Sequence, residues 1–314
     1  MISYTIRRLM VTLPVLLLIT VLTFVAIRIV PGDLAQVRLG DNATPQDARL
    51  LREELGLDEP LINQYWDWIR GMAQGDPGVS LQSGLPVASQ LRSRLPVTIE
   101  LALMTTFVSV CLALPLGILS ATFRGTLLDH VVRVMSVLGQ AIPSFWLAIM
   151  ALTLLSIYAH WAPPFAYRPL WEDPRHNLEQ MLLPVVILGF AQSAPLMRMT
   201  RTTMLETLRH DYIRTARAKG LHGRTVIMSH ALRNALIPIV TVVGIQTGTL
   251  IAGAIVLEQI FSLPGVGKLT LESITSRDYT QLQFNVLVLA AAVLLINLVV
   301  DLSYQFLNPR VRVS

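Results

Sequence analysis

Long stretches without a charged residue alternate along the chain with shorter stretches in which charges are frequent. Six charge-free stretches reach or approach the roughly 20 residues that an α-helix needs to cross the apolar core of a bilayer. They are residues 9–27, 101–123, 134–159, 180–197, 235–257 and 282–300. The pattern predicts an all-α membrane protein with six transmembrane helices.

The fourth stretch, residues 180–197, is the shortest of the six. It contains Pro184, Gln192 and Pro195, which would be poor neighbours for lipid because each leaves a polar group in need of a partner. We therefore expect this helix to pack inside the bundle. Arg28 and Glu258 lie at the outer ends of their stretches, where long side chains are expected to extend toward water.

The balance of charge between the stretches predicts the orientation. Residues 31–97 contain six Arg and nine Asp or Glu, a balance of −3, and residues 198–233 contain eight Lys or Arg and two Asp or Glu, a balance of +6. Positively charged loops stay in the cytoplasm, so residues 31–97 are expected outside and residues 198–233 inside. Both termini are then cytoplasmic, next to two basic pairs: Arg7 with Arg8, and Arg310 with Arg312.

This orientation divides the chain into three parts. They are an N-terminal transmembrane helix (1–30), an extracytoplasmic segment (31–97) and a five-helix transmembrane domain (98–308) with a cytoplasmic loop at 199–234. The composition agrees, because 53% hydrophobic and 14% charged residues are membrane values. The net charge of +5 lies beside the membrane spans and so does not indicate a nucleic-acid partner.

The extracytoplasmic segment is the only large part outside the predicted spans. Thr44 is suited to cap a helix that begins at Pro45, and Gly56 with Pro60 should divide that region into two short helices. About 65 residues with few apolar groups would make a marginal core. We therefore expect a cap over the outer mouth of the bundle instead of a separate domain.

The basic loop has a pattern of its own. Leu205, Leu208, Tyr212 and Ala216 are spaced so that they would share one face of a single helix. Gly220 and Gly223 bracket a turn in which glycine can take a positive φ angle. A second short helix over residues 225–236 would follow. The loop is predicted to form a compact knob on the cytoplasmic face.

The residues of this loop resemble those of a known family. The stretches DYIRTARAKGL (211–221) and HALRNALIP (230–238) resemble the coupling loop of ABC-importer permeases, whose general form is Glu-Ala-Ala, three residues and Gly. Ala216 and Gly220 match the second Ala and the Gly. Arg214 and Thr215 replace the Glu and the first Ala, which is how the dipeptide/oligopeptide/nickel branch looks.

Further stretches resemble the same branch nearly from end to end. They are VPGDLA (30–35), LGLDEPL (55–61), GDPGVSL (75–81), PVASQLRSRLPVTIELA (86–102), IPSFWLA (142–148), IVLEQIFSLPGVGKL (255–269), RDY (277–279) and NLVVDLSYQFLNPRVR (297–312). The long outer segment after the first span resembles that of the first of the two permeases in such systems.

The resemblance implies a type I ABC importer permease fold and a set of partners. These are a second, homologous permease, two ATPases that bind ATP and Mg²⁺, and an extracytoplasmic substrate-binding protein. The implied substrates are di- or oligopeptides, with nickel or a metal chelate as the alternative. The knob would dock on one ATPase through Leu208, Tyr212, Ala216, Gly220 and Leu221.

The chemistry of an enzyme is missing from the sequence. The stretch SLPGVGKL (262–269) has Ser262 and Leu269 where a phosphate-binding loop needs Gly and Ser or Thr. The six His residues and Cys111 show no metal-ligand spacing. We therefore expect a non-catalytic chain that holds no cofactor or metal.

Polar and small residues inside the spans have two interpretations. Gln192, Gln246 and Asn297 are candidates for lining a translocation path, but they could equally bond to neighbouring helices. Gly244 and Gly248 are four residues apart, which allows close helix packing. No charge lies near the centre of a span. The absence of such a charge disfavours a stand-alone secondary carrier. A secondary carrier or a channel is the competing class of protein.

Overall fold

The computed structural model describes residues 2–29, 39, 44–54 and 56–307. Residues 30–35, Leu55, Arg310 and Arg312, on which expectations above depend, lie outside the described residues. The described part of the chain is helical, and its β pairing is limited to one isolated antiparallel bridge between Val79 and Pro86. The all-α prediction is confirmed.

Five helices in the described residues are long and apolar enough to cross a membrane, and there are six if one bent pair counts as a single span. The five are α1 (Ile2–Ile29), α5 (Val87–Thr122), α8 (Pro174–Thr207), a continuous helix through α11 (Leu232–Gly253), and α14 (Tyr279–Leu307). The bent pair is α6 (Leu127–Ala141) and α7 (Ser144–Ala159), the region predicted as the third span.

The prediction of one unbroken helix over residues 134–159 is wrong. The axes of α6 and α7 differ by 96°. The break lies at Pro143, which has no N–H to donate and disfavours the helical conformation in the residue before it. Ile142 accordingly has an extended backbone, with φ −90° and ψ 122°.

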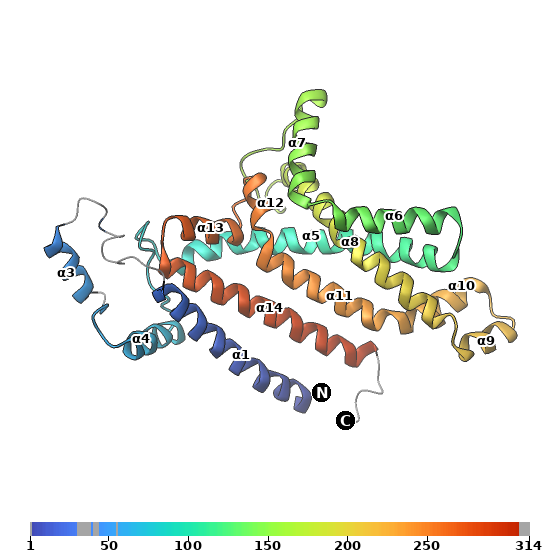
Figure 1. Cartoon of the computed structure of the whole chain (residues 1–314), viewed down its shortest axis with the longest axis horizontal. Helices are drawn as coiled ribbons and strands as arrows, with labels where there is room; N and C mark the ends of the chain where they lie inside the picture. The colour runs from blue at the N-terminus through green and yellow to red at the C-terminus, as the bar shows by residue number, and fades with distance from the viewer. Residues whose placement is uncertain (1, 30–38, 40–43, 55, 308–314) are drawn as a thin grey trace. The chain divides into compact units, whose positions relative to one another are not determined.

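The chain packs as two compact units. The first unit comprises Val97–Leu263 and the part of α14 from Val293 onward. In it, α8 contacts α6 on one side and α11 on the other (Figure 1). In its most apolar window, 61% of α8 is buried, against 33% or less in the other four spanning helices. The expectation that the fourth span packs inside the bundle is confirmed.

Small residues bring the helices of the first unit close to α8. A Cβ atom added to Gly117 of α5 would lie 2.6 Å from the Cβ of Thr200, and one added to Gly139 of α6 would lie 2.8 Å from the Cβ of Ala194. Real Cβ atoms do not approach so closely. These two glycines therefore set the spacing of α5 and α6 from α8.

The second unit comprises the described residues up to Pro96 together with Pro264–Ala292. It includes α3 (Pro45–Glu54) and α4 (Leu61–Ala73), so the predicted division of the outer segment into two short helices is confirmed. Thr44 caps α3 as predicted. Its hydroxyl accepts the N–H of Asp47 at 3.2 Å, and the Asp47 carboxylate accepts the N–H of Thr44 at 3.2 Å.

Two motifs that are far apart in the sequence meet in the second unit. Asp278, just before α14, is buried and accepts the N–H of Gln281 at 3.2 Å, which caps that helix. The same carboxylate accepts the N–H of Leu81 at 3.1 Å and the hydroxyl of Ser80. The end of the GDPGVSL stretch is thereby fixed to the RDY stretch, beside α13 (Val266–Thr275).

Candidate functional site

The predicted knob is built around α9 (Asp211–Ala218), whose end is defined by Gly220. Gly220 has a φ of 77°, and its N–H donates to the carbonyl of Arg217 at 2.9 Å. The N–H of Leu221 donates back to the carbonyl of Ala216 at 3.4 Å. These two bonds form a Schellman motif. The predicted positive φ at Gly220 is confirmed, whereas Gly223 begins the short α10 (Gly223–Thr225).

The predicted single apolar stripe is wrong. The helix that contains Leu205 ends at Thr207, with Leu208 as its cap, and α9 starts only at Asp211. The side chains that α9 buries are Ile213 and Ala216, which join the hydrophobic core of the first unit. Tyr212 and Leu221 are each 42% exposed. Of the five predicted coupling residues, Ala216 is therefore a core residue, and Tyr212, Gly220 and Leu221 are on the surface.

Tyr212 connects α9 to the helix that follows the knob. Its hydroxyl accepts a hydrogen bond from Nδ2 of Asn234 at 2.8 Å, and the same Nδ2 lies 3.1 Å from the carbonyl of His230. His230 belongs to a π-helical turn, η1 (Val226–Ala231), which runs directly into α11. The predicted separate helix over residues 225–236 is therefore wrong. It is the start of the fifth span, and Pro238 lies inside α11.

The exposed face of the knob is positively charged. Arg214, Arg217 and Lys219 are exposed on α9 and its cap, and Arg224 follows on α10. Asp211 at the start of α9 forms an ion pair with Arg214. Asp211 is the one acidic residue of α9, so that helix offers no further acidic partner to Arg217, Lys219 or Arg224. The knob thus presents basic side chains around a glycine turn and the apolar side chain of Leu221.

A buried ion pair that the sequence pattern did not reveal joins three helices of the first unit. Asp129 of α6 is 1% exposed, and Arg201 of α8 donates to its two carboxylate oxygens at 2.8 and 3.0 Å. Ser120 of α5 and the N–H of Gly125 donate to the same carboxylate at 2.6 and 2.9 Å. Three helices are therefore joined at one carboxylate. Because Asp129 and Arg201 are 72 residues apart, no local signal connects them.

Two of the three path candidates meet in the first unit. The amide Nε2 of Gln246 on α11 donates to the backbone carbonyl of Gln192 on α8 at 3.1 Å. Gln192 lies in the turn before Pro195, and its carbonyl accepts this bond from the neighbouring helix. Asn297 lies at an exposed position of α14 and does not join this contact.

The glycine pair on α11 packs against α14 of the same chain. A Cβ atom added to Gly244 would lie 2.0 Å from Cγ2 of Val300, and one added to Gly248 would lie 3.5 Å from Cγ1 of Val293. The close helix contact that their spacing predicts is present. The two helices can approach so closely only because Gly244 has no side chain.

Neither of the charged residues expected to extend toward water does so. Glu258 of α12 (Ile255–Ile260) is fully buried and accepts the hydroxyl of Thr98 at 2.7 Å. Arg28 of α1 lies 3.8 Å above the ring of Phe24 and donates to Oε1 of Gln64 on α4 at 2.9 Å. Both expectations are wrong for the same reason. Each side chain has a specific partner inside its own unit, and that partner takes the place of water.

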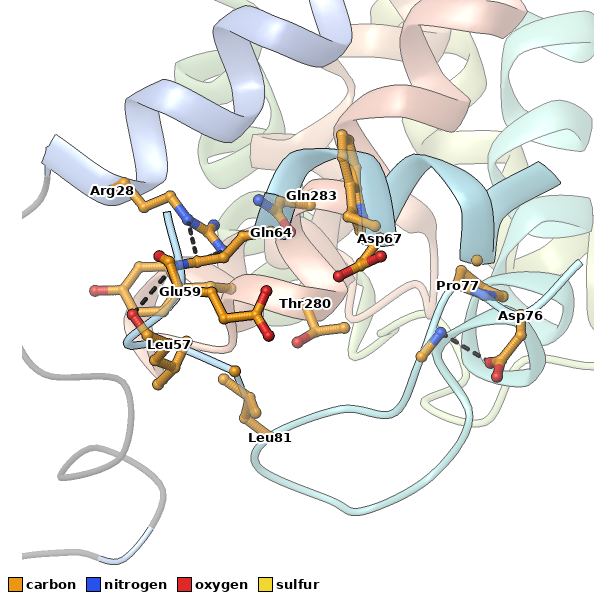
Figure 2. Close-up of a pocket in the computed structure, with 15 residues that line it drawn as sticks. Arg28, Leu57, Glu59, Gln64, Asp67, Asp76, Pro77, Leu81, Thr280 and Gln283 are labelled. Atoms are coloured by element: carbon orange, nitrogen blue, oxygen red, sulfur yellow. Dashed lines mark hydrogen bonds between the residues drawn. The ribbon is translucent and has the colours of Figure 1, made fainter. Parts of the chain in front are cut away.

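A pocket of about 330 Å³ lies in the second unit, next to the contact between Arg28 and Gln64. Figure 2 shows these two side chains pointing toward each other, with Glu59 and Asp67 nearby. The amide of Gln64 also donates to the carbonyls of Leu57 and Glu59, at 3.0 and 2.9 Å. Gln64 therefore fixes the start of α4 to the last turn of α1.

The loop before α8 is fixed by two ionisable groups in the first unit. Asp173 caps α8, and the N–H of His176 holds the pKa of that carboxyl below its usual value. Burial, followed by a hydrogen bond of 2.5 Å to Glu100, raises the pKa of Tyr167 above its usual value.

Two family models match the sequence. The model described as binding-protein-dependent transport system inner membrane component matches residues 113–313. The model for the N-terminal part of the membrane component of such systems matches residues 1–102.

Several curated proteins are similar over almost their whole length. The dipeptide transport system permease protein of Escherichia coli (strain K12) is 38% identical over 338 aligned residues, which cover 99% of each chain. The di/tripeptide transport system permease protein of Pseudomonas aeruginosa (strain UCBPP-PA14) is 39% identical over 333 residues. A putative peptide transport system permease protein of Brucella abortus (strain 2308) is 39% identical over 312 residues, and both alignments again cover 99% of each chain.

A solved structure has a similar fold. A chain of an inward-facing methionine ABC transporter matches with a TM-score of 0.56, covering 71% of this chain and 98% of that chain. The two sequences are 17% identical, so the likeness concerns the fold alone.

Proposed function

This chain belongs to the family of binding-protein-dependent transport system inner membrane components, and we propose that it forms half of a translocation path for di- or oligopeptides. It is a multi-pass inner membrane permease subunit of an ABC importer. The observation that carries the substrate class is the similarity, over 99% of the chain, to permeases of dipeptide, di/tripeptide and peptide transport systems. No comparable observation favours nickel or a metal chelate.

The division of labour in the transporter follows from what the chain lacks. Its sequence contains no phosphate-binding loop, so ATP and Mg²⁺ are bound by two partner ATPases. A second, homologous permease supplies the other half of the path, and an extracytoplasmic binding protein delivers the peptide. This chain itself binds no cofactor.

The proposed topology has six spans, with α6 and α7 together forming the third. Both termini and the loop 199–234 are cytoplasmic, and residues 31–97 face outward. The charge balance of the two loops supports this orientation. Single cysteines replacing Gln74 or His222, both exposed, in a Cys111→Ala background test it with an impermeant thiol reagent on intact cells. We expect labelling at position 74, and labelling at position 222 alone would contradict the proposed topology.

The knob is proposed to transmit movement between the ATPases and the spans. Its exposed surface, with Leu221 at the turn and Tyr212 beside it, would sit in a groove of one ATPase. Movement of the knob would then reach α11 through the bond between Tyr212 and Asn234, and α8 through the chain itself. Alternating access follows as rigid-body rocking of packed helices around the path. Gln192, Gln246 and Asn297 remain candidates for lining that path.

Reconstitution of the complete transporter tests the substrate class. Liposomes that contain both permeases, the ATPases and the binding protein should accumulate labelled dipeptide when ATP is supplied, and excess unlabelled dipeptide should compete. Nickel should neither accumulate nor compete. The purified chain alone should accumulate nothing. Uptake of nickel without uptake of peptide would exclude the proposed substrate, and ATP-driven uptake by the chain alone would exclude the proposed division of labour.

Substitutions at the turn test coupling. Gly220→Val places a branched side chain at a φ of 77°, which costs on the order of 1–2 kcal/mol and distorts the turn. We expect ATP hydrolysis to become uncoupled from uptake, or the ATPases to bind less well, while membrane expression is kept. Gly84→Val is the matched control, because Gly84 also has a positive φ of 68° with open space around it but belongs to the outer segment. Full uptake by the transporter that carries Gly220→Val would contradict the proposed coupling role.

A further inference from the structure

Helix α4 is fixed along the side of the transmembrane helix α1. The hydroxyl of Tyr65 lies 2.8 Å from that of Thr20, and the ring of Tyr65 meets that of Phe24 edge-on at 5.4 Å. One turn further along α1, Arg28 bonds Gln64 (Figure 2). Thr20, Phe24 and Arg28 are spaced four residues apart and so share one face of α1. The contact extends over three turns and is not confined to the end of the helix.

These contacts fix the depth of α4 relative to the apolar span. The apolar window of α1 ends at Ile29. At 1.5 Å per residue, Phe24 lies about 7–8 Å and Thr20 about 13 Å below that end. The rings of Tyr65 and Trp68, which both contact Phe24, are therefore below the edge of the apolar span. These contacts place α4 beside the C-terminal end of the apolar span of α1.

Part of the exposed surface of α4 is apolar. Leu61, Ile62 and Trp66 are 59%, 64% and 58% exposed. Successive residues of a helix are 100° apart, so Ile62 and Trp66 lie about 40° apart, and Leu61 begins the same helix. Asp67 lies about 100° beyond Trp66, on the side of α4 that is exposed and polar. Such a division, with a tryptophan on the apolar side, is typical of helices that lie in a membrane interface.

The side of α1 that faces away from α4 is also apolar and exposed at this level. Leu22, Val25 and Ile29 there are 58%, 44% and 75% exposed. We propose that α4 lies in the interfacial layer of the membrane, with Leu61, Ile62 and Trp66 in contact with lipid. The proposal rests on the membrane location of α1 but not on the identity of the substrate, so failure of one leaves the other intact.

Site-directed fluorescence in the complete transporter tests this placement. Ile62→Cys and Trp66→Cys, each in a Cys111→Ala background, are labelled with bimane and reconstituted in nanodiscs of phosphatidylcholine with or without bromine on the acyl chains. We expect brominated lipid to reduce the fluorescence about twofold at both positions, because the labels lie among acyl chains. Aqueous iodide should have little effect there. Asp67→Cys is the matched control on the polar side and should show the opposite pattern.

Two outcomes would overturn the proposal. Quenching of positions 62 and 66 by iodide, as at position 67, would place this face in water. Protection from both quenchers would mean that another protein chain covers it. Leu61→Cys provides a third exposed apolar position on α4 if removal of the tryptophan impairs assembly, and dipeptide uptake by each labelled transporter confirms that the fold is retained.

Discussion

Helices α1 and α8 are both long enough to span a membrane, but they use apolar residues in opposite ways. The most apolar window of α1 has a mean hydropathy of 2.6 and is 17% buried, whereas that of α8 has a mean hydropathy of 1.5 and is 61% buried. In a soluble protein the more apolar helix would be the more buried one. Here the order is reversed, because lipid accepts apolar side chains and only protein can satisfy polar ones.

This reversed order of hydropathy and burial explains which interactions α8 makes. Its Arg201 pairs with a buried carboxylate, its Gln192 carbonyl accepts an amide from α11, and its surface is approached closely by glycines of two neighbouring helices. α1 instead exposes leucine and valine along most of its length. A spanning helix with a low mean hydropathy is therefore expected at the centre of the bundle. Three substitutions test this rule.

The largest effect is expected from Arg201→Met. This change keeps the volume of the side chain but leaves Asp129 buried without its bidentate partner, since Arg133 is 3.8 Å away and half exposed. Removing one member of a buried pair costs about 3–5 kcal/mol. We expect a large fall in the thermal midpoint of the purified permease complex. Arg198→Met is the control, because Arg198 is exposed and bonds only an amide, that of Gln140. Equal effects of the two changes would contradict the rule.

A smaller loss is expected from Gly117→Leu on α5. The new side chain would meet Thr200 and the carbonyl of Met197, which an added Cβ would approach to 3.0 Å. Overpacking of this kind costs about 1–3 kcal/mol. The thermal midpoint measures it. Gly125→Leu serves as the comparison for an added leucine in open space, although its φ of 80° adds some strain of its own. If Gly117→Leu were neutral, α5 could move away from α8 without cost.

The smallest effect is expected from Leu18→Ala on α1. Leu18 is 57% exposed, so its loss leaves little cavity within the protein. Surface substitutions usually change stability by less than about 0.5 kcal/mol. The same thermal assay should show almost no shift. A loss of several degrees would mean that this face of α1 is covered by the second permease and not by lipid.

The sequence predicts best what is decided locally. Gly56 and Pro60 separate α3 from α4, Thr44 caps α3, and Gly220 ends α9, because each acts on the few residues beside it. The break at Pro143 was missed for a different reason. Proline can bend a spanning helix or break it, and hydropathy is the same in both cases.

The hydrophobic and polar pattern of the sequence does not predict contacts between residues that are far apart in the chain. The end of α8 at Thr207 has no glycine or proline to mark it, so one apolar stripe was predicted across two helices. The ion pair between Asp129 and Arg201 joins positions that nothing in the local sequence connects. The charged residues in the loops predict the orientation of the chain in the membrane. Which charged side chains are buried depends on the packing of α5, α6 and α8, which the local sequence does not show.

The Schellman turn at Gly220 also bears on how the transporter assembles. Its two backbone bonds, together with the burial of Ile213 and Ala216, fix the shape of α9 without help from any other chain. A segment that folds only on contact gives up ordering entropy at that moment, whereas a rigid one does not. If an ATPase docks on the knob as proposed, it meets a preformed shape, and association should be limited by diffusion and orientation and not by refolding of the loop. Exposed arginines on that shape should make the association rate fall as salt is added.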